Sequence, residues 1–78
     1  MTCLNSTPPK DLCQLLDELV HAMVESGVEL SFARLSLEKT YISEVLRRNQ
    51  NNIGQSASAL GMHRNTLSKR IRDLQIQL

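Results

Sequence analysis

Six basic residues gather in the last 32 positions of the 78-residue chain, where Asp73 is the single acid. They are Arg47, Arg48, Arg64, Lys69, Arg70 and Arg72. Residues 1–46 show the opposite balance, so that a net charge of −4 precedes a net charge of +5. Guanidinium and ammonium groups concentrated in one half of a chain indicate ion pairing with a polyanion such as a phosphate backbone. Charge alone is equally consistent with a solvated helix surface.

Other reactive side chains lack partners at the spacings that catalysis or metal binding requires. Cys3 and Cys13, with no further Cys or His at ligand spacing, predict neither a zinc site nor a disulfide framework and favour a reducing compartment. His21 has no acid or cysteine at a catalytic spacing, so we expect it at the polar edge of a helix. We therefore expect no enzyme activity, no cofactor and no metal. No apolar run is long enough for a membrane span or a secretory signal, which favours a cytoplasmic protein.

The spacing of apolar residues predicts an all-α fold of four helices with no strand. After a flexible N-terminus over residues 1–8, residues 9–49 are expected to form a helical hairpin. Its first helix, over about 9–26, starts at Thr7-Pro8-Pro9, carries apolar residues three and four positions apart, and ends at Ser26-Gly27. Its second helix, capped by Ser31 or Ser36, ends in the polar residues 47–51.

The apolar stripe of the second helix is too broad to be covered by a single neighbouring helix. A chain of this size buries only about 60% of its unfolded surface, so a second copy of the chain or the C-terminal helices must cover the remainder. We therefore expect the hairpin to form a homodimer. The residues predicted at the subunit contact are Leu12, Leu15, Leu16, Leu19, Val20, Met23, Phe32, Leu35 and Ile42.

Residues 50–78 have the pattern of a helix-turn-helix. Asn52 with Gln55 three positions later is typical of a capped helix start, and Gly61 supplies the left-handed residue of a sharp turn. Met62 begins the last helix, in which Leu67 and further apolar residues bury one face while polar and basic residues project from the other. A major groove admits one such helix, so we expect residues 63–74 to act as a recognition helix.

The stretch from Leu37 to Ile76 resembles the factor for inversion stimulation (Fis) family, whose module also closes the nitrogen-regulator type of enhancer-binding proteins. The most specific resemblance lies in Ala57, Leu60-Gly61, Arg64, Thr66-Leu67 and a basic residue at position 70 before Ile71. The resemblance implies a homodimer that binds double-stranded DNA, places its last helices in adjacent major grooves and bends the duplex. It further implies a transcription regulator or a nucleoid-associated protein of a bacterial cytoplasm.

Carried over by position, the resemblance assigns Arg64 to a guanine edge and Asn52, Thr66, Lys69 and Arg70 to phosphates. The complete set of expected DNA-binding residues is Asn52, His63, Arg64, Asn65, Thr66, Ser68, Lys69 and Arg70. Three positions depart from the family: His63 replaces the commoner Asn or Ser, Gly54 replaces a small polar residue, and Gln55 replaces a frequent Arg. These departures predict fewer phosphate contacts and a shallower salt dependence than in the strongest members.

Two alternatives stay open. The chain could be the C-terminal DNA-binding domain of a larger enhancer-binding regulator, which shares the DNA function. It could instead be a helical adaptor whose hairpin binds another protein. RNA polymerase or an activator ATPase domain are the candidate protein partners, and no membrane partner is expected.

Overall fold

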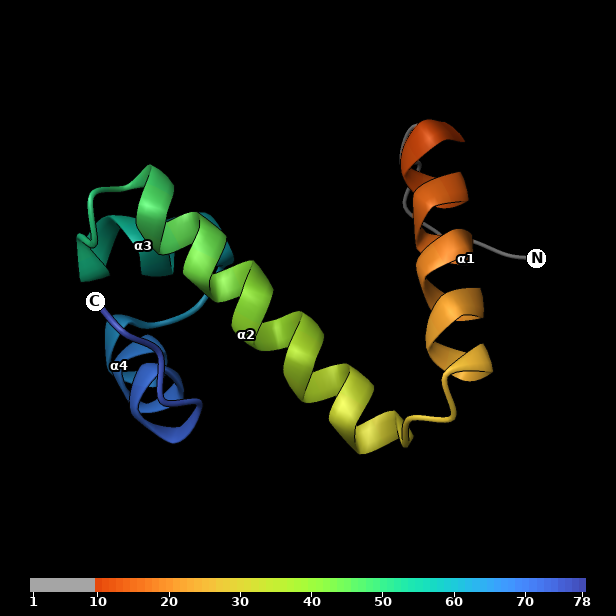
Figure 1. Cartoon of the computed structure of the whole chain (residues 1–78). Helices are drawn as coiled ribbons and strands as arrows, with labels where there is room; N and C mark the ends of the chain where they lie inside the picture. The colour runs from red at the N-terminus through yellow and green to blue at the C-terminus, as the bar shows by residue number, and fades with distance from the viewer. Residues whose placement is uncertain (1–9) are drawn as a thin grey trace. The chain divides into compact units, whose positions relative to one another are not determined.

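Four helices make up the computed structural model, which describes residues 10–78 (Figure 1). Helix α1 spans Lys10–Glu25, α2 spans Leu30–Arg48, α3 spans Ile53–Leu60 and α4 spans Arg64–Asp73. No strand occurs in this described range, and the prediction of an all-α fold of four helices is confirmed. The expected flexible N-terminus at residues 1–8 lies outside the described residues.

The chain divides into two compact units, Met1–Ala33 and Arg34–Leu78, and the boundary falls inside α2. The sequence pattern predicts a boundary near residue 49, after the second helix. The physical reason for the difference is the packing of α2, because Ile42 and Leu46 are buried in one cluster with residues of α3 and α4. Most of α2 thus belongs to the helix-turn-helix unit.

In the first unit, α1 carries the predicted apolar stripe and ends close to the predicted residue. The backbone turns at Gly27, whose φ of 75° is left-handed, and Ser26 Oγ donates to the carbonyl of Ala22 at 2.9 Å. The stripe is largely uncovered, since Leu15 is 61% and Val24 is 71% exposed. Cys13 is disulfide-bonded, so the expectation of reduced cysteines is wrong for this residue; Cys3 lies outside the described residues.

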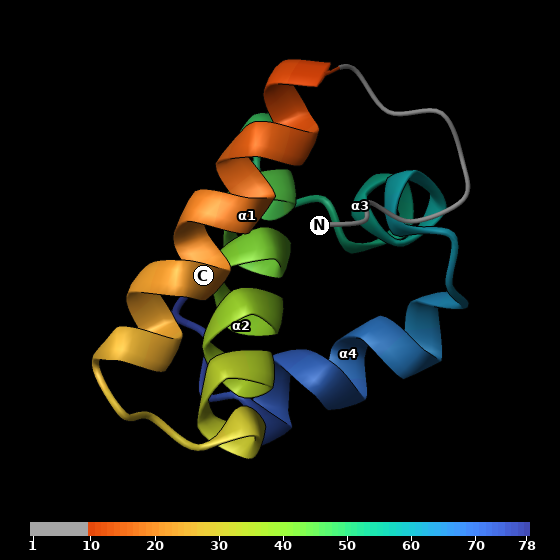
Figure 2. The same ribbon diagram turned by 90° about the vertical axis from the view of Figure 1, so that its right-hand side faces the viewer.

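The second unit contains a small core that α2, α3, α4 and the C-terminal segment share. Its buried apolar residues are Ile42, Leu46, Ala57, Leu67, Ile71 and Ile76. Ile53, Leu60, Met62 and Leu74 pack against them as partly buried residues. The inward faces predicted for the last two helices are therefore confirmed. In both ribbon views α3 and α4 are short helices joined by a tight turn (Figures 1 and 2).

Two helix starts differ from the prediction. Helix α2 begins at Leu30, so neither Ser31 nor Ser36 caps it, and the carbonyl of Glu29 accepts from the N–H of Ala33 at 3.0 Å in the first turn. Helix α4 begins at Arg64 with His63 as its N-cap, whereas we expected the helix to begin at Met62. Met62 instead packs against the core, because it belongs to the turn that closes α3.

Candidate nucleic-acid interface

The turn between α3 and α4 closes through two backbone hydrogen bonds across Gly61. The N–H of Gly61 donates to the carbonyl of Ser58 at 3.1 Å, and the N–H of Met62 donates to the carbonyl of Ala57 at 3.0 Å. This pair of bonds is a Schellman motif, which requires a left-handed residue, and Gly61 has a φ of 73°. The predicted turn is therefore present, and the burial of the small Ala57 lets the two helices approach closely.

Both helices of the motif have a side-chain cap at the N-terminus. Asn52 Oδ1 accepts from the N–H of Gln55 at 2.8 Å, which confirms the predicted cap of α3. His63 Nδ1 accepts from the N–H of Asn65 at 3.0 Å. An imidazole nitrogen that accepts a hydrogen bond carries no proton, so the His63 ring is neutral in this arrangement and its Nε2–H is the available donor. The Nδ2 amide of Asn52 is likewise a donor.

Helix α4 separates a buried face from an exposed polar face. Leu67 and Ile71 lie in the core, at 0% and 8% exposure. The exposed residues include seven of the eight expected DNA-binding residues: Asn52, His63, Arg64, Asn65, Thr66, Ser68 and Lys69. The packing of α4 thus leaves its expected DNA-binding residues on one accessible surface: Arg64, Asn65, Thr66, Ser68 and Lys69. Arg72 is exposed on the same helix. Exposed donors on a single helix suit both base edges and phosphate oxygens.

Half of the six basic residues in the C-terminal part are engaged by carboxylates. Glu44 accepts from Arg47 Nη2 at 2.5 Å and from Arg48 Nε at 2.8 Å. Hydrogen bonds from Arg47 and then from Arg48 lower the pKa of Glu44 from its ordinary 4.5 to about 2. The third engaged cation is Arg70, which pairs with Glu38. Within the described residues no carboxylate lies within ion-pair distance of Arg64, Lys69 or Arg72, so these three supply the accessible positive charge of α4.

Arg70 is the one expected DNA-binding residue that is not fully exposed. Its Nε and Nη2 donate to the two carboxylate oxygens of Glu38, each at 2.6 Å. These hydrogen bonds, which Arg70 donates to Glu38, also raise the pKa of Arg70. Arg70 follows Leu67 by three positions and thus lies beside the buried face of the helix, toward α2. The structure therefore does not bring Arg70 together with the other predicted contacts.

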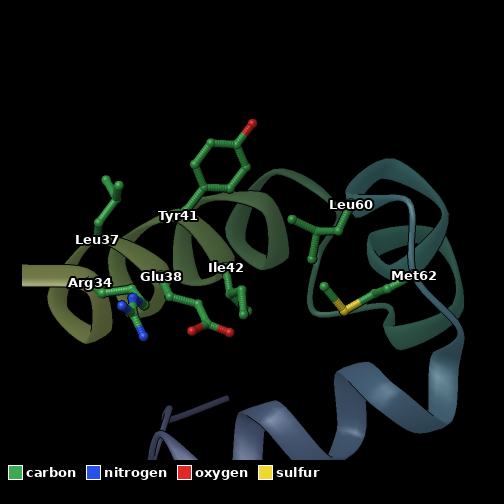
Figure 3. A pocket seen from close by; sticks show the side chains of 7 residues that line it. All are labelled: Arg34, Leu37, Glu38, Tyr41, Ile42, Leu60 and Met62. Carbon is green, nitrogen blue, oxygen red and sulfur yellow. The ribbon is translucent and has the colours of Figure 1, made fainter. Parts of the chain in front are cut away.

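A hollow of about 290 Å³ lies where α2 meets the end of α3 (Figure 3). It is lined by Arg34, Leu37, Glu38, Tyr41, Ile42, Leu60 and Met62. Figure 3 shows Leu60 and Met62 pointing toward Ile42, while the Tyr41 ring points away from them. Most of the lining is apolar, and Glu38, its one carboxylate, is paired with Arg70.

The described residues contain no cluster of three His, Cys, Asp or Glu side chains that could hold a metal ion. None of the helices among them is long and apolar enough to cross a bilayer. His21 lies on the exposed surface of α1, where its Nε2 is 3.9 Å from Glu25 Oε2. Both side chains are more than 70% exposed, so the contact is a weak surface pair on α1.

The residues expected at a subunit contact fall into two groups. Leu12, Leu15, Leu19, Val20, Phe32 and Leu35 are exposed, and Leu16 and Met23 are partly exposed. Ile42, in contrast, is 2% exposed within the core of the second unit. Ile42 is therefore not available for the expected subunit contact, because residues of its own chain already cover it.

Three residues that matter in the second unit were absent from our expectations. Glu38 holds Arg70, Ile76 joins the core, and the hydroxyl of Ser56 is buried without a hydrogen-bond partner among the described residues. Apolar Ile76, two positions after Leu74, was a detectable signal for burial. Nothing in the local sequence marks Glu38 as the partner of a residue 32 positions away.

In the comparison with protein families, the chain matches the family model described as "Bacterial regulatory protein, Fis family". It covers residues 35–74, which is half of the chain and contains the helix-turn-helix with most of α2. No curated protein and no solved structure gives a significant match. The matched range lies within the second compact unit, Arg34–Leu78.

Proposed function

Because the chain belongs to the Fis family of bacterial regulatory proteins and carries its DNA-binding helix-turn-helix, we propose that it acts as a homodimeric, sequence-influenced DNA-binding regulator. In this proposal α4 enters the major groove and the duplex bends to meet both subunits. The observation that carries the proposal is the exposed polar face of α4, fixed behind by Leu67 and Ile71 and presented by the Gly61 turn.

The contacts of this face follow from its donors. Arg64, in the first turn of α4, has a planar guanidinium that suits the O6 and N7 acceptors of guanine. Lys69 is an exposed ammonium that suits a phosphate. The neutral His63 ring caps α4 with Nδ1, so its Nε2–H would donate to a base or phosphate acceptor.

The proposed homodimer uses the exposed apolar stripe of α1. Leu12, Leu15 and Leu19 are 54%, 61% and 42% exposed, and the burial of such side chains contributes about 25 cal/mol per Å² of apolar area. A contiguous apolar surface of this kind is typical of an interface between subunits. Two copies would also supply two recognition helices, as a two-fold symmetric DNA site requires.

The DNA-binding function is tested by titrating the full chain with random and genomic DNA fragments at several salt concentrations. We expect affinity to fall steeply as salt rises, and a subset of fragments to bind more tightly. Arg64→Ala should weaken binding to the preferred fragments by about 1–3 kcal/mol and should weaken binding to random DNA much less. Lys39→Ala, on the exposed surface of α2, is the matched control. An absence of salt-dependent binding would favour the adaptor alternative.

The homodimer is tested by analytical ultracentrifugation at micromolar concentration. We expect a dimer for the native chain and a monomer for Leu15→Glu, which places a charge in the apolar stripe of α1. Gln14→Glu puts the same charge on the adjacent polar position and should remain dimeric. A monomeric native chain at these concentrations would contradict this part of the proposal.

The proposal extends to the cellular setting. A bacterial regulator of this family would act on DNA in the cytoplasm, associated with the nucleoid, and RNA polymerase or an activator ATPase domain are its candidate protein partners. Crosslinking in cells followed by sequencing of bound DNA tests the location on the genome.

A further inference from the structure

The ion pair between Glu38 and Arg70 joins α2 to α4. Two parallel hydrogen bonds of 2.6 Å connect the guanidinium to the carboxylate, and the two side chains are 30% and 32% exposed. Figure 3 shows the Glu38 carboxylate pointing to the side of α2 on which α4 lies. A bidentate arginine to carboxylate pair of this geometry restricts the orientation of both partners.

This pair differs from the other side-chain hydrogen bonds of the structure. Within residues 14–78, every other hydrogen bond that a side chain makes joins positions at most four apart. Such bonds stabilise single helices and turns, and they do not orient one helix on another. The Glu38–Arg70 pair connects positions 32 apart and is therefore the polar contact that orients α4 on α2.

The pair lies next to the core that packs α4. Arg70 directly precedes the buried Ile71, and Glu38 lies one helical turn before the buried Ile42. Apolar packing is non-directional, and the core of this unit is small. A bidentate contact at the edge of such a core adds the directional restraint that the apolar residues do not supply.

A phosphate contact by Arg70 competes with this arrangement. The guanidinium already donates through Nε and Nη2 to a carboxylate, and a phosphate would have to replace those bonds. The Glu38 carboxylate would also repel a phosphate at this position. Arg64, Lys69 and Arg72 offer accessible charge on α4 without that competition.

We propose that Arg70 is a positioning residue, which acts through Glu38 to hold α4 in the orientation that presents Arg64 and Lys69 to DNA, and that Arg70 makes no phosphate contact. The proposal rests on the proposed DNA-binding function. It assigns Glu38, a carboxylate in a DNA-binding unit, a role that favours binding.

Glu38→Gln gives opposite results under the two assignments. If Arg70 contacts a phosphate, the variant frees the guanidinium and removes a negative charge, so DNA affinity rises. If Arg70 positions α4, the variant loosens the helix and affinity for preferred fragments falls several-fold. Arg70→Lys is the second discriminating variant, because an ammonium retains the charge for a phosphate but cannot form the bidentate pair.

The experiment measures affinity for a preferred fragment against salt for the native chain, Glu38→Gln, Arg70→Lys, Arg70→Gln and the reversed pair Glu38→Arg with Arg70→Glu. We expect the three single variants to bind several-fold more weakly with an unchanged salt slope, and the reversed pair to recover most of the affinity. Loss of a phosphate contact would instead make the negative slope of log affinity against log salt shallower by about 0.9 for each contact. The proposal would be overturned if Glu38→Gln bound the fragment more tightly than the native chain, or if Arg70→Lys bound it with native affinity. A shallower salt dependence for Arg70→Gln would overturn it as well.

A thermal unfolding series on the same proteins separates this inference from the proposed function. The double variant Glu38→Gln with Arg70→Gln completes a double-mutant cycle that does not depend on the reversed pair folding. We expect the change in the free energy of unfolding for this double variant to differ from the sum of the changes for Glu38→Gln and Arg70→Gln alone. Additive effects would contradict the pairing itself, whereas a coupled pair in a chain that binds no DNA would overturn the proposed function and, with it, the role in DNA binding.

Discussion

The backbone N–H of Asn65 donates to Nδ1 of His63 at 3.0 Å, which makes His63 the N-cap of the proposed recognition helix. Loss of a side-chain cap leaves an unsatisfied N–H at a helix start. We expect His63→Ala to lower the free energy of unfolding by about 1 kcal/mol. His63→Asn keeps an acceptor at the cap and should remain within a few tenths of a kcal/mol of the native chain. Chemical denaturation followed by circular dichroism measures both, and equal destabilisation by the two substitutions would contradict the capping role.

Two glycines of the helix-turn-helix should respond to alanine with opposite signs. At Gly61 an added Cβ meets nothing within 4 Å, but the φ of 73° is unfavourable for alanine, so we expect Gly61→Ala to cost about 1–2 kcal/mol. Gly54 lies within α3, where its Cβ would make an ordinary contact of 3.6 Å with Asn52 Oδ1. Gly54→Ala should stabilise the chain by about 0.5–1 kcal/mol. Thermal unfolding compares the two, and a shift in the same direction for both would be inconsistent with this backbone assignment.

The buried Ser56 hydroxyl has no hydrogen-bond partner within residues 10–78 and is fully shielded from solvent. Removing an unsatisfied buried polar group relieves a desolvation penalty of about 1–3 kcal/mol. We therefore expect Ser56→Ala to raise the melting temperature by several degrees. Ser58→Ala changes an exposed serine of the same helix and controls for helix propensity. An equal or smaller gain at position 56 than at position 58 would show that the hydroxyl is satisfied.

Lys69 is the exposed cation of α4 that we expect to meet a phosphate. Removing one phosphate contact makes the negative slope of log affinity against log salt shallower by about 0.9. Lys69→Gln should show this reduction with random DNA as well as with a preferred fragment. Lys39→Gln removes the same charge from the exposed surface of α2 and should leave the slope nearly unchanged. Fluorescence anisotropy at four or more salt concentrations measures the slope, and identical slopes for the two variants would exclude Lys69 from the interface.

The pairing of Glu44 with Arg47 and Arg48 predicts a dependence of stability on pH. The pKa of Glu44 is about 2 in the folded chain and 4.5 ordinarily, so the stabilising contribution is complete above pH 4.5 and is lost as the pH falls toward 2. Glu44 is exposed to solvent, and the effect should be small. Melting temperatures of the native chain and Glu44→Gln should differ at pH 6 and converge near pH 2. A constant difference across this range would contradict the ion-paired state of Glu44.

Local signals in the sequence allowed the two helices, the Asn52 cap and the Gly61 turn of the helix-turn-helix to be predicted. The Asn52 cap and the Gly61 turn each depend on hydrogen bonds between residues at most five positions apart. The predicted cap of α2 failed because neither Ser31 nor Ser36 lies at the observed helix start. From the sequence, His63 is expected among the DNA-binding residues; the structure shows in addition that it caps α4, since the ring nitrogen is within reach of Asn65 only when α4 begins at Arg64.

By itself, the sequence determined the four helices, the separation of charge and the exposed donors of α4, because helical periodicity and capping operate over a few neighbouring positions. Only the tertiary structure decided that Ile42 is covered by its own chain and that Arg70 is held by Glu38. The physical reason is that burial and ion pairing depend on which helix faces meet. A residue beside the buried face of α4 carries the same charge as one on the exposed face, and only its distance to α2 distinguishes a positioning contact from a phosphate contact.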